Sequence, residues 1–107
     1  MEHVLLPQVS AERQQSGKLY REFLHLPTLS VGLYELAAGA ADPQKPHGED
    51  EVYYVVKGRA RFRCGDEDVP VEAGSVLLVR AEEVHAFHAI TEELSLLVFF
   101  APAEGTT

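Results

Sequence analysis

Two histidines and one glutamate stand at positions from which they could hold one metal ion. His47 and Glu51 lie at the start of an apolar run, and His85 closes a second apolar segment that begins at Gly74. Two imidazoles and a carboxylate form the facial ligand set of non-haem iron enzymes, and the same ligands also bind zinc. Three protein ligands leave positions open for water, substrate or dioxygen, as a catalytic metal site requires.

The same residues also fit a site without metal, because a histidine beside a carboxylate is often a hydrogen-bonded structural pair. Lys45 supports this alternative, since an ammonium near the site repels a dication and could pair with Glu51 instead. Lys45 could also lose its proton on burial or turn outward to solvent. Tyr53 lies two positions after Glu51 and could present its phenol to a ligand, or it could be a core aromatic. Tyr53 and Lys45 are therefore the candidates for moving a proton in a catalytic site.

Short strands must position these side chains, because no part of the chain shows the sustained 3.6-residue period of an amphipathic helix. Turn residues divide the chain into eight predicted strands, and this spacing is typical of a sandwich or barrel. We expect an all-β jelly-roll barrel over residues 18–107, as one domain. Residues 1–17 are expected to form an N-terminal arm or a short helical turn. The predicted strands are roughly 18–26, 29–37, 49–57, 59–64, 67–72, 75–80, 84–90 and 94–101.

Residues 59–72 are predicted to form a β-hairpin around Gly65-Asp66, a pair suited to a two-residue turn. This register places opposite charges on one face and apolar pairs on the other. The three arginines at alternate positions therefore indicate a solvated charged face in preference to an anion-binding stripe. The expected cross-strand pairs are Arg59 with Glu72, Arg63 with Asp68, and Phe62 with Val69.

Length and charge limit the possible partners. The chain has 107 residues, enough for one domain, and its net charge of −8 argues against nucleic acid. The longest apolar run, Leu96 to Pro102, is too short to span a bilayer. The acidic start and very short apolar run of residues 1–7 do not resemble a secretory signal, so we expect a cytoplasmic protein.

Two predicted strands are apolar on both faces. Residues 52–56 and 96–100 do not alternate between apolar and polar side chains, although one face of an antiparallel sheet normally meets water. The outer face must then be covered, either by the N-terminal arm or by a second copy of the chain. We expect a homodimer.

The first apolar segment resembles the first signature motif of the cupin superfamily. That motif runs from a glycine through His-x-His and a glutamate to a second glycine. Gly39, His47, Glu51 and Gly58 fall in register with it, whereas Lys45 stands where the first histidine belongs. The resemblance therefore implies three of the family's four usual metal ligands.

The second segment resembles the second cupin motif, in which a glycine precedes a Pro-x-Gly turn, a histidine and an asparagine. Gly74 and His85 match this pattern. Arg80 and Glu82 replace the proline and glycine of the turn, and Ala89 replaces the asparagine.

Membership of this superfamily implies a double-stranded β-helix that holds a divalent ion such as iron, manganese, nickel or zinc. Small cupins include dioxygenases, isomerases and lyases, so the resemblance implies a metal-dependent enzyme acting on a small polar molecule. The alternative is a non-catalytic barrel that binds or senses a small ligand. Such a barrel could be free of metal, with Lys45 anchoring an organic anion.

Overall fold

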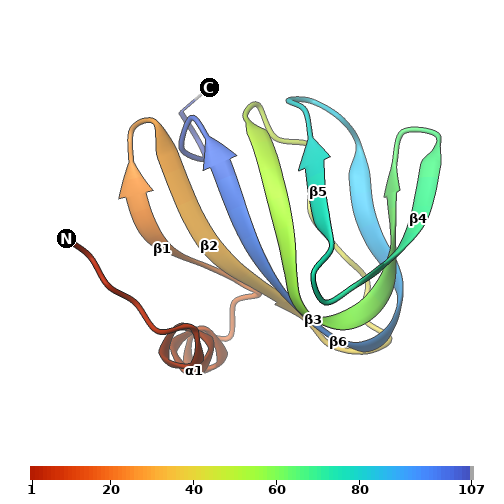
Figure 1. The fold of residues 1–107 in the computed structure, drawn as a ribbon, viewed down its shortest axis with the longest axis horizontal. Coiled ribbons are helices and arrows are strands. Elements are labelled where there is room, and N and C mark those ends of the chain that lie inside the picture. Colours follow the sequence, from red (N-terminus) through yellow and green to blue (C-terminus); the bar gives the residue numbers. More distant parts are fainter. Residues whose placement is uncertain (107) are drawn as a thin grey trace.

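The computed structural model describes residues 1–106 as one curved antiparallel sheet with a single helix at its side (Figure 1). The sheet order is β1-β2-β6-β3-β4, and β5 pairs with β3. The prediction of an all-β barrel is therefore confirmed. The elements are α1 (Leu6–Ser16), β1 (Tyr20–Leu26), β2 (Leu29–Leu36), β3 (Asp50–Cys64), β4 (Glu67–Glu72), β5 (Val76–Val79) and β6 (His85–Ala101).

Two strands are longer than the sequence predicts. The breaks expected at Lys57-Gly58 and at residues 91–93 are not turns, because β3 and β6 continue through them with shifts in pairing register. Gly58 has a φ of 106°, and a Cβ there would lie 2.2 Å from the Glu93 carbonyl oxygen. Glycine at this position therefore lets the two strands bend closely together, so that one pair of strands serves both halves of the barrel.

The hairpin of β3 and β4 has the predicted register, with Arg59 opposite Glu72, Arg63 opposite Asp68 and Phe62 opposite Val69. Phe62 is buried, whereas the arginines are exposed and form ion pairs. Arg59 Nη1 lies 2.7 Å from Glu72 Oε2. The arginine stripe is therefore a solvated charged face, as predicted.

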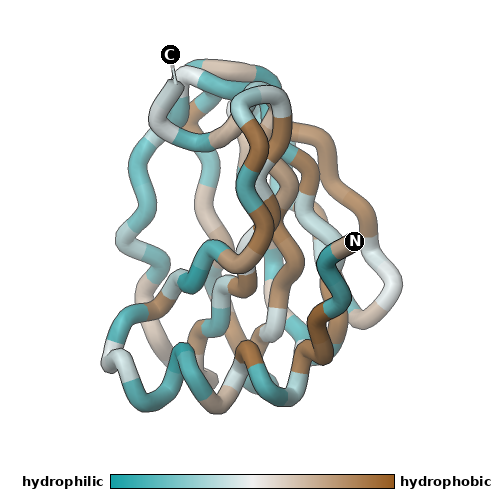
Figure 2. Tube along the Cα trace, turned by 90° about the vertical axis from the view of Figure 1, so that its left-hand side faces the viewer, coloured by the Kyte–Doolittle hydropathy of each residue, from teal (hydrophilic) through white to brown (hydrophobic). Residues whose placement is uncertain are grey.

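The N-terminal segment contains an 11-residue helix, which is longer than the short turn that the sequence predicts. Figure 2 shows that α1, which crosses the bottom of the view, is mainly hydrophilic, and Val9 is its only buried residue among those described. Contacts with β2 hold α1 in place: Ser10 Oγ and Arg13 Nε donate to Glu35 Oε1 at 2.8 and 2.7 Å. Periodicity does not reveal this helix, because a single apolar anchor leaves no periodic stripe to detect.

The outer face of the sheet is covered over only part of its width. Helix α1 packs on β2, where Leu33 is 1% exposed. Beyond it, the neighbouring side chains of β3 and β5 face solvent: Tyr54 is 40%, Val76 66% and Leu78 59% exposed. Tyr54 pairs across the strands with Val76, and Val52 pairs with Leu78. These four residues form what we call the open apolar patch.

The core lies inside the curve of the sheet, between the inward-facing side chains of β2, β3 and β6. The buried apolar residues include Tyr34, Leu36, Tyr53, Val55, Phe62, Phe87, Leu94, Leu96, Val98 and Phe100.

Of the part of the chain that the structure describes, no helix has the length and apolar character needed to cross a membrane.

Candidate metal centre

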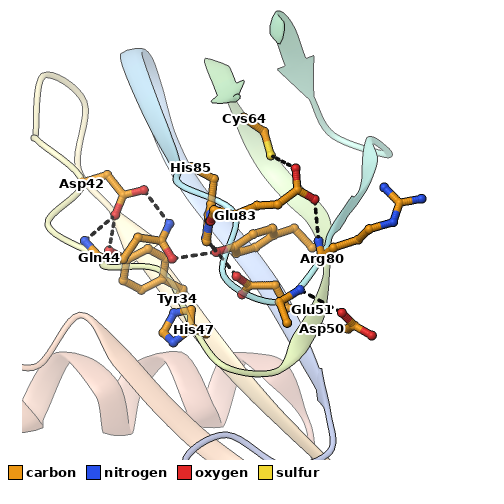
Figure 3. Close-up of polar contacts among 12 residues, drawn as sticks. Tyr34, Asp42, Gln44, His47, Asp50, Glu51, Cys64, Arg80, Glu83 and His85 are labelled. Carbon is orange, nitrogen blue, oxygen red and sulfur yellow. Dashed lines mark hydrogen bonds and ion pairs between the residues drawn. The ribbon is translucent and has the colours of Figure 1, made fainter. Parts of the chain in front are cut away.

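The fold brings together the three residues that the sequence predicts as metal ligands. Glu51 lies at the start of β3, His85 begins β6, and His47 lies in the loop before β3. One nitrogen or oxygen atom from each lies within 4.8 Å of the other two. Glu51 and His85 are 2% and 4% exposed, and His47 is partly exposed. Figure 3 shows the three side chains converging from these separate elements.

The His85 ring is fixed by a hydrogen bond on each nitrogen. Nδ1 lies 2.8 Å from the Glu83 carbonyl oxygen, which can only accept, so Nδ1 carries a proton. Nε2 then faces Glu51 Oε1 at 2.8 Å. Burial lowers the pKa of His85, but hydrogen bonds to Glu51 and to the Glu83 carbonyl outweigh burial and raise the pKa above its usual value. In the protein without metal, the contact with Glu51 therefore stabilises the protonated form of His85.

Glu51 also has an unused oxygen. Its Oε2 is buried and has no hydrogen-bond partner among the described residues. Leaving a buried acceptor unpaired costs free energy, and charged acceptors cost more than neutral ones. An additional partner for this carboxylate would therefore stabilise the site.

A chain of hydrogen bonds supports the site from the loop before β3. The Tyr53 hydroxyl donates to Gln44 Oε1 at 2.6 Å and lies 3.1 Å from His85 Nε2. Gln44 Nε2 donates in turn to Asp42 Oδ2 at 2.6 Å. Burial and the Glu51 carboxylate raise the pKa of Tyr53 well above its usual range, so its hydroxyl keeps its proton.

Asp42 ties this loop to the barrel. Its carboxylate accepts from the Tyr34 hydroxyl at 2.6 Å and from the Phe87 backbone N–H at 2.9 Å, in addition to Gln44. Sequence reasoning singles out Tyr53 but misses Gln44 and Asp42. Nothing in their spacing signals a role, because they lie in an irregular loop where side-chain direction does not follow a period of two.

Lys45 does not occupy the ligand position assigned to it by the motif. It is exposed and does not line the cavity beside His47, whereas its neighbour Gln44 does. The irregular loop before residue 49 breaks the alternation that would have placed Lys45 and His47 on the same face. A role for Lys45 in proton transfer, or as the anchor of an anion, therefore finds no support in its position.

The turn that precedes His85 also holds His47. Glu82 replaces the family glycine and has a φ of 70°, a conformation that non-glycine residues rarely adopt. In this conformation its backbone N–H donates to the His47 carbonyl oxygen at 2.7 Å. The left-handed turn is thus retained without its usual glycine, and it links the two loops that carry the histidines.

Two of the three ligand candidates, His47 and Glu51, line a cavity of about 450 Å³, a size suited to a small molecule. Its wall includes the rings of Tyr20, Tyr34, Tyr53 and Phe100, and the His47 and Phe100 rings meet edge to face at 4.9 Å. Glu104, from the segment after β6, adds a carboxylate whose Oε2 lies 3.6 Å from His47 Nδ1. The lining residues are Lys18, Leu19, Tyr20, Tyr34, Pro43, Gln44, His47, Glu51, Tyr53, Val98, Phe100 and Glu104.

Glu51 and His85 have the spacing of two ligands on one divalent ion, and the donor atom of His47 lies within 4.8 Å of both. Ligands about 2.1 Å from an ion and at right angles to each other are about 3 Å apart. The 2.8 Å between Glu51 Oε1 and His85 Nε2 is close to that spacing. The unpaired Glu51 oxygen provides a further position for binding.

The other histidines on the strands lie elsewhere. His25 pairs with Glu22 at 3.2 Å on the surface, and His88 pairs with Asp68 at 3.0 Å. Cys64 is partly buried, and its Sγ lies 3.4 Å from Glu83 Oε2. Burial and the Glu83 carboxylate raise the pKa of the Cys64 thiol, which disfavours the reactive thiolate.

Comparison with known proteins places this chain in a family. Residues 32–101 match the family model described as the cupin domain. Uncharacterized protein SCO3923 of Streptomyces coelicolor is 48% identical over 100 residues, which cover 94% of this chain and 95% of the relative.

Solved structures agree with this match. TT1209 from Thermus thermophilus has a TM-score of 0.75 and 26% identity, and the match covers 96% of this chain and 99% of that chain. A cupin family protein with a double-stranded β-helix fold from Methanocaldococcus jannaschii has a TM-score of 0.70 and 15% identity. That match covers 78% of both chains and confirms the expected double-stranded β-helix. The chain belongs to the cupin family.

Proposed function

We propose that this cupin binds one divalent metal ion through His47, Glu51 and His85 and catalyses a reaction of a small polar molecule in the adjoining cavity. The observation that carries the proposal is the convergence of the three donor atoms within 4.8 Å. The buried Glu51 oxygen without a partner among the described residues supports it, because a cation is the partner that a carboxylate would gain. Iron, manganese, nickel and zinc all accept these ligands.

The residues around the ligands suit proton transfer and substrate orientation. A bound ion would polarise an oxygen atom of the substrate. Tyr53 keeps its proton and lies beside His85, and its hydroxyl hydrogen would have to leave Gln44 Oε1 to stabilise negative charge that develops near the ligands. Gln44 and Asp42 hold the Tyr53 hydroxyl in place. Oxygenase, isomerase and lyase reactions all fit this arrangement.

A second candidate is a binding barrel without metal. The contact of Glu51 Oε1 with His85 Nε2 at 2.8 Å favours this candidate, because each of these two atoms already has a polar partner without an ion. In that case the cavity would hold a small ligand for a sensing or carrier role. Since Lys45 is exposed, the ligand would meet Tyr53, Gln44 and His47 instead.

Metal content per chain tests the proposal directly. Untagged protein purified without chelator should contain close to one equivalent of metal by elemental mass spectrometry, and His47→Ala should lose it. His88→Ala is the matched control, because His88 is partly exposed and pairs with Asp68 on the charged face. No metal in the wild type, even after anaerobic incubation with iron, manganese, nickel and zinc, would refute the proposal and favour the binding barrel.

We also propose that a second copy of the chain covers the open apolar patch. The patch has no charged side chain, whereas the chain carries a net charge of −8, so the patch is a region where two copies meet without repulsion. A two-fold axis would place the patch against itself, as in most homodimers. With three side chains at least 40% exposed, it offers the apolar centre of an interface.

The cytoplasmic location stays a prediction.

A further inference from the structure

The segment after β6 is fixed to the barrel by its backbone. Ala103 is fully buried, and its N–H donates to the Pro27 carbonyl oxygen at 3.3 Å. The Glu104 N–H donates to Ser30 Oγ at 3.0 Å, and Ser30 is fully buried. Because these contacts use backbone atoms of residues 103 and 104, the Glu104 side chain is not needed to hold the segment in place.

This anchoring directs the Glu104 carboxylate into the cavity. Glu104 lines the cavity beside His47, and its Oε2 lies 3.6 Å from His47 Nδ1. The group of ligand atoms within 4.8 Å of one another comprises His47, Glu51 and His85 and does not extend to Glu104. Glu104 therefore lies next to one ligand without belonging to the set, and it lies outside the residues that match the family model.

Each histidine has an oxygen near Nδ1, but the distance is 2.8 Å at His85, a hydrogen bond, and 3.6 Å at His47, a longer electrostatic contact. At His85, the Glu83 carbonyl oxygen accepts from Nδ1 and leaves Nε2 toward Glu51. At His47, the Glu104 carboxylate faces Nδ1, and the Phe100 ring packs against the imidazole from the side. An oxygen at Nδ1 holds the proton there and leaves Nε2 free for an ion.

We propose that Glu104 is a positioning residue that holds the proton of His47 on Nδ1 and turns Nε2 toward Glu51 and His85. The inference rests on the proposed metal site. Glu104 also adds a second carboxylate beside that of Glu51, which favours a cation at the site. Removal of such a partner typically weakens metal binding by about 10- to 100-fold.

The test compares Glu104→Ala, Glu104→Gln and the wild type. Zn²⁺ affinity is measured by competition with a colorimetric chelator. The dissociation constant should rise by about 10- to 100-fold in Glu104→Ala and by less in Glu104→Gln, whose amide oxygen can still accept from Nδ1. Glu72→Ala is the matched control, because Glu72 carries the same charge but pairs with Arg59 on the exposed charged face. Its affinity should equal that of the wild type.

A second readout needs no metal. The ¹⁵N chemical shifts of the His47 ring in the metal-free protein, recorded above the pH at which the ring is protonated, report which nitrogen carries the proton. The Nδ1–H form should dominate in the wild type and lose that dominance in Glu104→Ala. Thermal melting checks that the variants are folded.

Unchanged Zn²⁺ affinity and an unchanged His47 tautomer in Glu104→Ala would overturn the inference while leaving the metal site intact. If Glu104→Gln binds Zn²⁺ as weakly as Glu104→Ala and keeps the wild-type tautomer, Glu104 is itself a ligand and the positioning role is wrong. If the wild type binds no metal, the proposed function fails first. The tautomer of the metal-free protein then still decides whether Glu104 orients His47.

Discussion

Replacing Glu51 by glutamine separates a metal site from a structural ion pair. Glu51 is 2% exposed, and glutamine keeps its shape while removing the charge. In the metal-free protein, loss of the ion pair with His85 is offset by removal of a charged oxygen that has no partner among the described residues, a defect that costs about 1–3 kcal/mol. We therefore expect the free energy of unfolding of the metal-free variant to stay within about 1 kcal/mol of the wild type.

The response to metal should differ strongly. An ion at about 100 times its dissociation constant adds about 2.7 kcal/mol to the stability of the protein that binds it. For a domain of this size that is a rise of about 10–15 °C in Tm. Calorimetry with and without metal should show this rise in the wild type and not in Glu51→Gln.

The opposite pattern would refute the reasoning. If Glu51 and His85 form only a structural pair, Glu51→Gln changes the metal-free protein in the same way, but the wild type and the variant respond alike to metal. Metal would then leave the Tm of the wild type unchanged. Glu93→Gln is the control for loss of one charge, because Glu93 is exposed and pairs with Lys57 at the surface.

Four further outcomes follow from the structure. The folded-state pKa of His85 is raised above the unfolded value near 6.5. Its contribution to the stability of the metal-free protein is therefore complete below pH 6.5 and is lost as the pH rises through the folded pKa. Urea melts across this range should show the loss in the wild type, and His85→Gln should not show it. Metal affinity should change in the opposite direction and rise with pH, since the ion needs a neutral imidazole; affinities that fall would contradict the assignment of His85 as a ligand. Gln44→His should tighten Zn²⁺ binding in a competition assay, because residue 44 lines the cavity. Lys45→His should leave Zn²⁺ affinity unchanged, because Lys45 is exposed. Tighter binding in Lys45→His alone would contradict the assignment of residue 44 to the cavity wall. Leu78→Glu should be a monomer where the wild type is a dimer, because it places a charge in the open apolar patch. Light scattering at micromolar concentration measures the mass of each, and a monomeric wild type would refute the proposed interface.

Regular strands are the part of the chain that could be predicted from sequence. The hairpin register follows from Gly65-Asp66 and from the charge pairs beside it, and every predicted pair is present. Phe87 is in phase with His85 along the strand, and both are buried. Successive side chains of a strand point to opposite faces of the sheet, so the face of each residue follows from its position in the sequence. These predictions therefore need no knowledge of the rest of the molecule.

Side-chain directions in irregular segments could not be predicted in this way. In the loop before β3, Gln44 and not Lys45 lines the cavity, because a loop has no fixed alternation. Glu104 reaches His47 only through the backbone contacts of Ala103 and Glu104 with the β1–β2 region, which depend on the whole fold. The breaks predicted at Gly58 and near Glu93 are bends instead, since glycine permits both a turn and a close approach of strands.

The long pairing of β3 with β6 has a consequence for how the protein is made. Glu51, the ligand candidate on β3, pairs across the strands with Phe100 in the second half of β6. Pairing between such distant segments is slow, because the entropy of closing the intervening loop is lost before any contact forms. The three donor atoms are therefore expected to come together late in folding, and a variant that lacks the second half of β6 should not form the site.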